Sequence, residues 1–432
     1  MTVLNAVRLL TAYTRAKRFD RIRDRQIIED QQQQWLVRLK EYVGRRSAYY
    51  RRWVGMPWAQ WPIVGKELWM AHFDEINTVG ARLEEVSAIA LRAEETRDFS
   101  PQWRTYTVGM STGTSGRRGI FLVSPAERSL WAGTLVGKLL RDGLLAQERI
   151  ALVLRAGATL YDSVGKLRLR FRFFDQMRPW NELVKDLCSF EPTILVAPAS
   201  VLRLLSNSAC RLQPRRVISV AEVLDDLDRR QIQSHFNLTV EQIYQATEGL
   251  LGVSCEHGTV HINEPYILIE PQWQDLEHSR FVPLVTDLRR RTQPIIRYRL
   301  NDVLQTAREP CPCGRAAMAL AAIEGRLDDV LWLEATGRSV PIFPDLLARV
   351  IVQSAEALQD YQVDELEQGH WRIALHPMPS IEEQQRLISQ CHALATRLGA
   401  PAPGITITDL IRVPQTSKQR RIRGAHSVKC AS

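Results

Sequence analysis

The sequence has little that would place it in a membrane or build a disulfide framework. Among its 432 residues there is no run of about eighteen apolar residues, the length that a bilayer-spanning helix needs. The N-terminus lacks an uninterrupted apolar stretch and a small-residue cleavage site, so it does not resemble a secretory signal. The seven cysteines are odd in number and mostly far apart, which is typical of a reducing compartment. We therefore expect a cytoplasmic protein with no transmembrane segment.

Two common nucleotide-binding patterns are also missing. No GxxxxGK[ST] loop occurs, and no GxGxxG opens a helix. The formal net charge is +9, but much of the excess lies near the two ends, in "RIRDR" and "SKQRRIR". No recognition motif for nucleic acid accompanies this charge, so we expect no nucleic-acid partner. A basic protein is equally suited to nucleotides, coenzyme A or an acidic carrier protein.

The residues that are present indicate a globular protein with a large core. Apolar residues make up 45% of the chain and charged residues 24%, and the length allows two or three domains. Near the N-terminus, Val3, Leu4, Val7 and Leu10 suit one face of a helix. We expect that helix to dock on its own domain, with a membrane-surface helix as the alternative.

The order of predicted elements indicates an α/β fold followed by a smaller unit. Between about residues 127 and 247, strands such as "RIALVLRA" and "TILVA" alternate with helical patterns, which favours a largely parallel sheet. From residue 258 the pattern changes to antiparallel strands. We place a boundary in "IEGRLDDVLWL" and predict a domain over 1–327 and an α+β domain over 328–432.

One short loop has the composition of a phosphate site. The stretch "GMSTGTSGRRGIF" at 109–121 contains four glycines, four hydroxyl side chains and two arginines between short apolar segments. Glycines let backbone N–H groups approach an anion, hydroxyls add donors, and arginine adds a charged fork. On its own, the loop fits a phosphate cradle and a structural turn about equally well.

Five blocks together resemble the adenylate-forming superfamily, which includes the acyl- and aryl-CoA synthetases. The loop "STGTSGRRG" is similar to its Ser/Thr/Gly-rich block, with Arg117 and Arg118 where a lysine is usual. The further blocks follow in the superfamily's order: "YQATEG" at 244–249, "IIRYRLND" at 295–302, "IEGRLDDVLWL" and "PQTSKQRRI" at 414–422. The segments "PIVGKELW", "VAEVLDD", "HINEPYILIE", "CPCGR" and "GRSVPIFP" are similar to the phenylacetate–CoA ligase branch.

The resemblance implies a fold and an activity. It implies a large N-terminal domain of parallel sheets flanked by helices, with a small β-barrel-like part, and a mobile C-terminal domain. The implied reaction is ATP-dependent activation of a carboxylic acid, expected to be aromatic, to an acyl-adenylate, followed by transfer to a thiol. Coenzyme A is the expected acceptor. A carrier-protein phosphopantetheine arm and a catalytically silent nucleotide-binding homologue are the alternatives. Departures such as Gln245 suggest an atypical member, suited to secondary metabolism.

The resemblance also assigns roles in nucleotide binding. The loop would cradle the β- and γ-phosphates of ATP, with Arg117 or Arg118 supplying charge, through Ser111, Thr112, Gly113, Thr114, Ser115 and Gly116. Thr247 would contact the α-phosphate, and Glu248 would hold Mg²⁺, a cation that prefers oxygen ligands. Tyr244 would stack on adenine, unless it is a core aromatic at a strand end. Asp302 would accept hydrogen bonds from the ribose, and Arg326 would lie near the ribose or the α-phosphate.

Two further assignments concern the C-terminal domain. Asp328 is the expected hinge residue, with Asp329 as its rival. Lys418 is the expected catalytic lysine, because a cation that bridges two reacting anions lowers the barrier. "TSKQRR" lacks the family's glycine before this lysine. Arg420 and Arg421 are positional rivals, and a solvated basic tail is the alternative interpretation.

Four residues form a candidate structural zinc site. Cys311 and Cys313 are two apart, with Cys255 and His261 upstream. Three thiolates and an imidazole make a Cys₃His set, and some relatives of the phenylacetate–CoA ligases carry a comparable one. Free cytosolic thiols are the alternative, since C-x-C is tighter than the usual C-x₂-C spacing.

Overall fold

The computed structural model describes residues 3–110, 119–144, 146–155, 169–208, 210–336, 338–355, 357–367, 369–410 and 420–424. Helices open the chain, as expected: α1 (Val3–Phe19), α2 (Arg25–Arg46), α3 (Ala48–Arg51), α4 (Lys66–Ala71), α5 (Phe73–Ile76) and α6 (Leu83–Thr96). A three-stranded sheet follows, formed by β1 (Gln102–Trp103), β2 (Tyr106–Met110) and β3 (Ile120–Val123). No helix in the described ranges is both long and apolar enough to cross a membrane.

A 12-stranded mixed sheet forms the centre of the molecule. Its parallel half alternates with helices, as the sequence predicts: β4 (Arg149–Leu154), β5 (Arg170–Asp175), α9 (Trp180–Phe190), β6 (Ile194–Ala197), α10 (Ala199–Ser206), β7 (Arg216–Val220), α11 (Asp226–Phe236) and β8 (Val240–Ala246). The helix that precedes them is α7 (Pro125–Leu139), which begins at a capping box made by Ser124 and Glu127.

The antiparallel half continues the same sheet. Its strands are β9 (Gly249–Ser254), β10 (Val260–Ile262), β11 (Ile267–Trp273), β12 (Arg280–Asp287), β13 (Tyr298–Arg299), β14 (Asp302–Thr306) and β15 (Ala319–Arg326). The order across the sheet is β11-β12-β14-β15-β10-β9-β8-β7-β6-β4-β5, with β13 paired to β12. The expected barrel-like part is therefore wrong in detail, because these strands pair onto β8 through β9 and form no closed barrel among the described residues.

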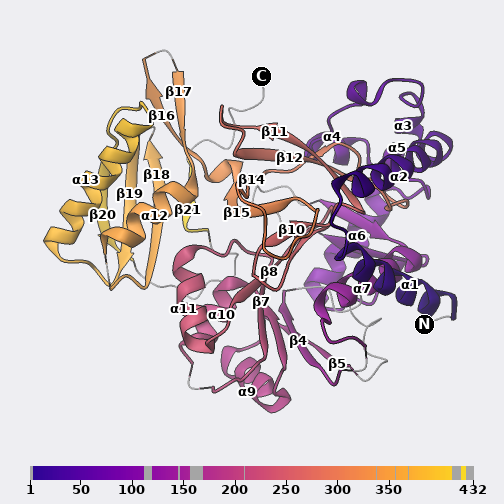
Figure 1. Ribbon diagram of the computed structural model, residues 1–432, viewed down its shortest axis with the longest axis horizontal. Coiled ribbons are helices and arrows are strands. Elements are labelled where there is room, and N and C mark those ends of the chain that lie inside the picture. Colours follow the sequence, from indigo (N-terminus) through magenta and orange to yellow (C-terminus); the bar gives the residue numbers. More distant parts are fainter. Residues whose placement is uncertain are drawn as a thin grey trace.

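Helices cover both faces of the parallel half (Figure 1). Along β4, Ile150 and Leu152 pack toward α1 and α7, whereas Ala151 and Val153 pack toward α9, α10 and α11. This alternation is the period of two that a strand imposes on its side chains. Both faces are apolar, as expected for a parallel strand buried between two helical layers.

The N-terminal helix docks on its own domain, as expected, but through a different face. Leu9, Ala12 and Ala16 are buried against α7, whereas Val3, Leu4, Val7 and Leu10 are 45–83% exposed. The contact depends on the absence of side chains at two helical positions of α7. A Cβ at Gly133 would lie 2.2 Å from the Leu9 carbonyl oxygen, and one at Gly137 would lie 2.8 Å from the Ala16 Cβ.

One covalent link was not predicted from the sequence. Cys188 of α9 and Cys210, beyond the end of α10, form a disulfide across the helical layer. Cysteine spacing alone gave no sign of the pair, since the two residues are 22 positions apart and come together only when both helices cover the same sheet face.

The chain after β15 forms a separate α+β unit at the left of Figure 1. A 3-10 turn, η2 (Leu327–Asp329), leads to β16 (Leu331–Ala335), β17 (Arg338–Ile342), α12 (Pro344–Ser354), β18 (Asp360–Glu367), β19 (His370–His376), α13 (Ile381–Arg397), β20 (Gly404–Asp409) and β21 (Ile422–Arg423). The unit has a hydrophobic core of its own, which agrees with the predicted boundary at residue 328. That boundary remains a prediction.

A buried ion-pair cluster joins the two units. Arg421 lies between three carboxylates, with its guanidinium nitrogens 2.9 Å from Asp228 and 3.0 Å from Asp360 and a further contact to Asp225. Arg203 of α10 reaches back across the interface, 2.6 Å from Asp360. Burial raises the pKa of Asp228 to about 6, against the opposing attraction of Arg421. Such a cluster depends on keeping every charge partnered.

Removing the central cation should therefore loosen the C-terminal unit. We expect Arg421→Met to lower the free energy of unfolding by about 3–5 kcal/mol, because the buried Asp228 and Asp360 would keep Arg203 as their ion-pair partner while the half-buried Asp225 would lose its contact with Arg421. The matched control is Arg423→Met, two residues further along in β21, whose side chain is 45% exposed. It should change stability by less than about 1 kcal/mol. Urea unfolding of both variants measures the difference. Equal losses would contradict the proposed importance of the cluster.

Candidate functional site

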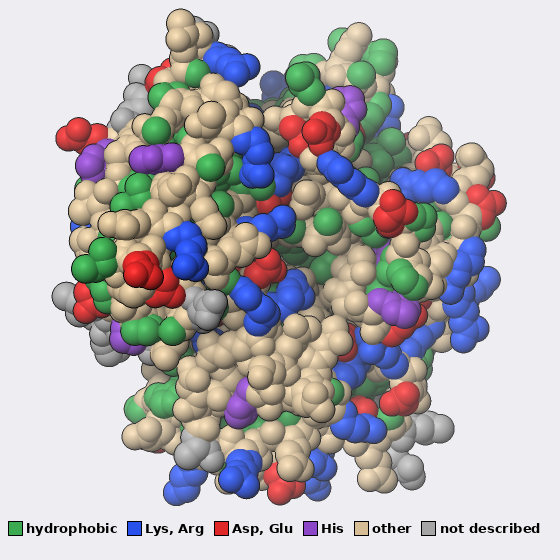
Figure 2. Space-filling model, turned by 60° about the vertical axis from the view of Figure 1, so that its left-hand side comes forward, with side chains coloured by type: hydrophobic (Ala, Val, Ile, Leu, Met, Phe, Trp, Pro, Cys, Tyr) green, Lys and Arg blue, Asp and Glu red, His purple; other side chains and the backbone are tan. Residues whose placement is uncertain are grey.

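A cavity of about 570 Å³ lies at the carboxyl ends of the parallel strands. Pro198 follows β6, Ala221 and Glu222 follow β7, and Thr247 and Glu248 follow β8, and all five line the cavity. Ligands of open α/β sheets bind outside the carboxyl ends of the strands, at the point where the strand order reverses. Here the strand order reverses at β4, because β5 pairs with one edge of β4 and β6 with the other. Figure 2 shows a hollow in the molecular surface with Lys and Arg side chains around it.

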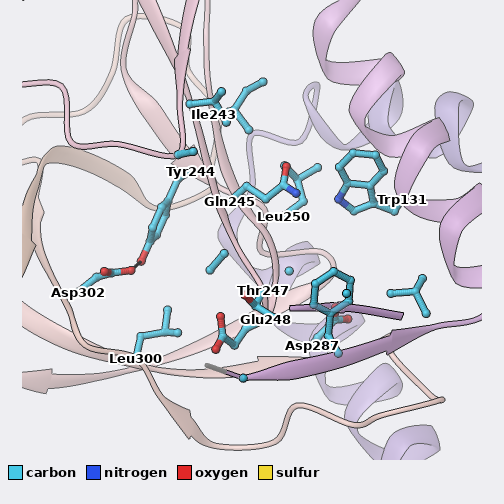
Figure 3. A pocket seen from close by; sticks show the side chains of 18 of the residues that line it. Trp131, Ile243, Tyr244, Gln245, Thr247, Glu248, Leu250, Asp287, Leu300 and Asp302 are labelled. Atoms are coloured by element: carbon cyan, nitrogen blue, oxygen red, sulfur yellow. Dashed lines mark hydrogen bonds between the residues drawn. The ribbon is translucent and has the colours of Figure 1, made fainter. Parts of the chain in front are cut away.

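The turn that carries Thr247 and Glu248 is held from the antiparallel half of the sheet. Arg290 donates from Nη1 to the Thr247 carbonyl oxygen over 2.8 Å. Figure 3 shows both turn residues close to Asp287, at the end of β12. The sequence block at 244–249 is thus a strand end and tight return in the structure, which aims its acidic side chain into the cavity.

Glu248 is a buried carboxyl in this cavity. Burial raises its pKa and the nearby Asp302 adds to the effect, whereas a hydrogen bond from Tyr298 opposes it. Isolated carboxylates in such surroundings are costly, and a hard divalent cation is one partner that stabilises the ionised form. The donor chemistry at this position therefore fits the predicted magnesium ligand.

Tyr244 and Asp302 point toward each other across from Trp131 (Figure 3), and Arg326 lines the same cavity. The Tyr244 hydroxyl donates to Asp302 Oδ2 over 2.7 Å, although the two residues are 58 positions apart in sequence. Asp302 opens β14 and lies directly opposite Arg326, the last residue of β15. Tyr244 is 7% exposed and belongs to a hydrophobic core cluster, while its ring also lines the cavity. The structure thus brings these three predicted residues together.

The phosphate loop and the catalytic lysine lie outside the described residues. This applies to Ser111, Thr112, Gly113, Thr114, Ser115, Gly116, Arg117 and Arg118, and to Lys418. The strands that flank the loop are described. Met110 of β2 pairs with Ile120 of β3, and Gly109, Met110 and Gly119 line the cavity. The two strand ends that flank residues 111–118 therefore both lie at the wall of the cavity.

The hinge candidates sit between β15 and β16. Asp328 accepts a hydrogen bond from Asn301 Nδ2 over 2.6 Å, and Asp329 accepts one from Arg420 Nε over 2.7 Å. Just before them, Gly325 has a φ of +123°, a conformation that side chains rarely allow. Arg420 and Arg421, the rivals of Lys418, are both held by carboxylates in this structure.

Sequence reasoning missed several cations that line the cavity, and one of them, Lys66, interacts electrostatically with Glu248 and Arg326. Lys66, the first residue of α4, lines the same cavity as Glu248 and Arg326. Burial lowers the pKa of its ammonium group, the attraction of Glu248 raises it, and Arg326 lowers it further. The segment "PIVGKELW" contains this lysine, but nothing in its spacing shows that α4 faces a site more than 180 residues further along the chain.

The four predicted zinc ligands come together. Their ligand atoms all lie within 4.8 Å of one another, and three of the four residues are buried. Cys255 Sγ is 3.6 Å from Cys311 Sγ, close to the separation of about 3.8 Å that two tetrahedral Zn–S bonds produce. His261 places Nδ1 3.0 Å from the Ala317 carbonyl oxygen, which favours a proton there and leaves Nε2, 3.2 Å from Cys313 Sγ, to act as a ligand.

Comparison with known proteins identifies the architecture. No protein-family model matches the sequence. A 2-hydroxyisobutyryl-CoA ligase in its postadenylation state superposes with a TM-score of 0.67 at 17% identity, over 90% of this chain and 87% of that one. An anthranilate CoA ligase gives 0.51 at 15% identity, over 74% and 67%. The chain has the fold of the adenylate-forming CoA ligases.

A curated sequence relative agrees with this fold. Phenylacetate-coenzyme A ligase of Thermus thermophilus is 26% identical over 189 residues, a segment that spans 41% of each protein. The resemblance to the superfamily, and to its phenylacetate–CoA ligase branch, is thereby confirmed. The same 2-hydroxyisobutyryl-CoA ligase superposes less well in its thioesterification state, with a TM-score of 0.52.

The geometry of the Cys/His cluster leads to a metal-content prediction. We expect the purified protein to contain about one zinc per chain, and Cys313→Ser to lose it, because the cluster supplies three sulfurs and one nitrogen. Cys391→Ser is the control, since Cys391 is buried in the C-terminal unit and lies outside the cluster. Elemental analysis measures both. Wild-type protein without stoichiometric zinc would contradict the site.

Proposed function

We propose that this protein is an ATP- and Mg²⁺-dependent acid–thiol ligase. It converts a carboxylic acid, expected to be aromatic, to an acyl-adenylate and then transfers the acyl group to coenzyme A. The observation that carries the proposal is the convergence of Tyr244, Thr247, Glu248, Asp302 and Arg326 on one cavity at the carboxyl ends of the parallel strands. The fold of CoA ligases and the phenylacetate-coenzyme A ligase relative support it.

In the first half-reaction the acid's carboxylate attacks the α-phosphorus of ATP and pyrophosphate leaves. Asp302 and Arg326 hold the ribose and α-phosphate end, and the 111–118 loop holds the β- and γ-phosphates. The strand pairing that sets Asp302 opposite Arg326 supports this assignment. Bound Mg²⁺ at Glu248 would neutralise phosphate charge. Both reacting groups are anions, so cations in the cavity lower the barrier.

Two lysines share that electrostatic role in our proposal. Lys418 retains the catalytic assignment that the sequence block gives it. Lys66 enters the cavity from α4 and lies close enough to Glu248 and Arg326 for their charges to shift its pKa. We assign Lys66 to the phosphate oxygens of ATP, where an ammonium donor would assist departure of pyrophosphate.

In the second half-reaction a thiol attacks the mixed anhydride and AMP leaves. The C-terminal unit would rotate about Asp328 between the two steps and withdraw Lys418. A second cavity, of about 650 Å³, lies between the units and is lined by Arg326, Arg349 and Arg420. Cationic side chains at a domain interface suit the anionic end of coenzyme A. The Cys₃His cluster would hold zinc in a structural role, away from the reacting groups.

Acid-dependent ATP–pyrophosphate exchange tests the proposal. With a panel of aryl and fatty acids, we expect exchange with at least one acid, and loss of about 10²-fold or more in Lys66→Met, because one positioned charge in a closed site contributes that much. Lys185→Met is the matched control, since it removes an exposed lysine from α9.

Three results separate the alternatives. Exchange with an acid, followed by thioester formation with coenzyme A, supports the proposal. If exchange occurs but the acyl group is transferred only to a phosphopantetheinylated carrier protein, then the carrier protein is the acceptor in place of coenzyme A. ATP binding with no exchange across the panel would favour the catalytically silent homologue.

A further inference from the structure

The lining of the main cavity includes three polar side chains, Asn263, Tyr266 and Arg289, which we call its polar end. Trp131 and Thr134 of α7 and Leu250 of β9 line the same cavity. Asn263 is 3% exposed and Tyr266 5% exposed, so their polar atoms are well removed from solvent. Neither side chain belongs to the blocks that the sequence analysis assigned to ATP.

Several polar atoms at this end lack hydrogen-bond partners among the described residues. They are Asn263 Oδ1, the Tyr266 hydroxyl and Arg289 Nη2. Thr134 and Arg289 lie close enough to the Tyr266 hydroxyl to influence its pKa, which burial raises. Buried polar groups are nearly always paired, so these three atoms call for an explanation. Ser219 Oγ, Arg290 Nε and Arg290 Nη2, elsewhere in the lining of the same cavity, also lack partners among the described residues.

The three side chains are fixed in place. The Arg289 guanidinium lies over the Tyr266 ring, 4.2 Å from its centre. Asn263 is fixed by its amide nitrogen, 3.3 Å from the Leu250 carbonyl oxygen. The Asp287 carboxylate accepts the backbone N–H groups of Arg289 and Arg290 over 2.9 and 3.1 Å. These supports give the polar end a defined set of donors and acceptors.

The space in front of this polar end is apolar. Figure 3 shows the Trp131 ring facing Leu250 and Gln245 across the cavity. Trp131 projects from α7, and Leu250 follows the turn that carries Thr247 and Glu248. An aromatic ring fits between an indole face and an aliphatic side chain, because both surfaces exclude water and allow stacking. A ring-bearing acid held here could direct its carboxylate toward the turn and its far end toward Asn263.

The unpaired atoms specify the group at the far end of that ring. Asn263 Oδ1 can only accept a hydrogen bond, whereas Arg289 can only donate, and the Tyr266 hydroxyl can do either. A hydroxyl group both donates and accepts, so it satisfies this set. An ionised carboxylate has no proton to donate, so it could not pair with Asn263 Oδ1 and would be repelled by the Asp287 carboxylate. A methyl group would leave all three atoms unpaired.

We propose that the acid substrate is an aromatic acid with a hydroxyl group distal to its carboxylate, and that Asn263, Tyr266 and Arg289 select it. This inference rests on the proposed adenylating function. Sites that hydrogen-bond a substrate hydroxyl reject analogues that lack it far more strongly than apolar pockets reject an extra methylene, because the analogue leaves buried polar groups unpaired.

Matched acids test the proposal in the exchange reaction. The pairs are phenylacetate with 4-hydroxyphenylacetate and 4-methylphenylacetate, and benzoate with its 3- and 4-hydroxy derivatives. For wild-type protein we expect kcat/KM to favour a hydroxylated acid over its unsubstituted partner by about 10²-fold or more. Tyr266→Phe should reduce that preference at least about tenfold, through loss on the hydroxylated acid alone. Tyr106→Phe, which removes a hydroxyl outside the cavity lining, is the control.

The readouts distinguish this inference from the proposed function. If wild-type protein uses hydroxylated and unsubstituted acids equally, or if Tyr266→Phe lowers both equally, the specificity assignment is wrong while the ligase activity stands. If no acid supports exchange, the proposed function fails, and calorimetric binding of the same acids decides the inference. If wild-type protein then binds the hydroxylated acid more tightly than Tyr266→Phe does, the assignment of the polar end to the substrate hydroxyl is supported. Equal binding by the two proteins refutes that assignment.

Discussion

The change of strand direction at β8 is the constraint on which the candidate site depends. All strands from β4 to β8 run parallel, so their carboxyl ends meet at one edge, and β9 then returns antiparallel beside β8. Because of that return, Thr247 and Glu248 lie at the rim instead of in a crossover connection. The same return links the parallel half to β10, β15 and β14, which carry Arg326 and Asp302 to the cavity. One continuous sheet therefore sets the distance between the Thr247–Glu248 turn and the pair formed by Asp302 and Arg326.

The contact between the N-terminal domain and the C-terminal unit has to be both strong and reversible, because we propose that the C-terminal unit rotates between the two half-reactions. Arg421 gathers Asp225, Asp228 and Asp360 in a buried cluster, and Arg420 holds Asp329 beside the candidate hinge. A rotation of the C-terminal unit would separate Arg421 from Asp225 and Asp228, and Arg203 from Asp360. The pairs Arg421–Asp360 and Arg420–Asp329 lie within that unit and would move with it. Charged groups suit such an interface, because each partner regains hydration when the pair opens, whereas an apolar contact of the same size would expose its surface to water.

Much of the architecture could be predicted from the sequence, because it follows from local patterns. The alternation around "RIALVLRA" and "TILVA" predicts the parallel half, and the blocks ending at Glu248, Asp302 and Arg326 predict one wall of the cavity. Other features depend on contacts that no local pattern encodes. Lys66 reaches the site only because α4 packs beside the antiparallel strands, and the docking face of α1 is set by Gly133 and Gly137 on α7. The prediction of a barrel-like part was wrong in detail, because the sequence of a short antiparallel strand does not indicate which sheet edge it pairs with.

The transfer of oxygen from the acid to AMP tests the central claim most directly. If the carboxylate attacks the α-phosphorus, an acid labelled with ¹⁸O in its carboxyl group should leave one labelled oxygen in the phosphate of AMP after thioester formation. Mass spectrometry of the recovered AMP measures this. Labelled AMP, formed only in the presence of both acid and thiol acceptor, is the predicted result. Unlabelled AMP, or label found in inorganic phosphate with ADP as the product, would contradict adenylate formation at this site.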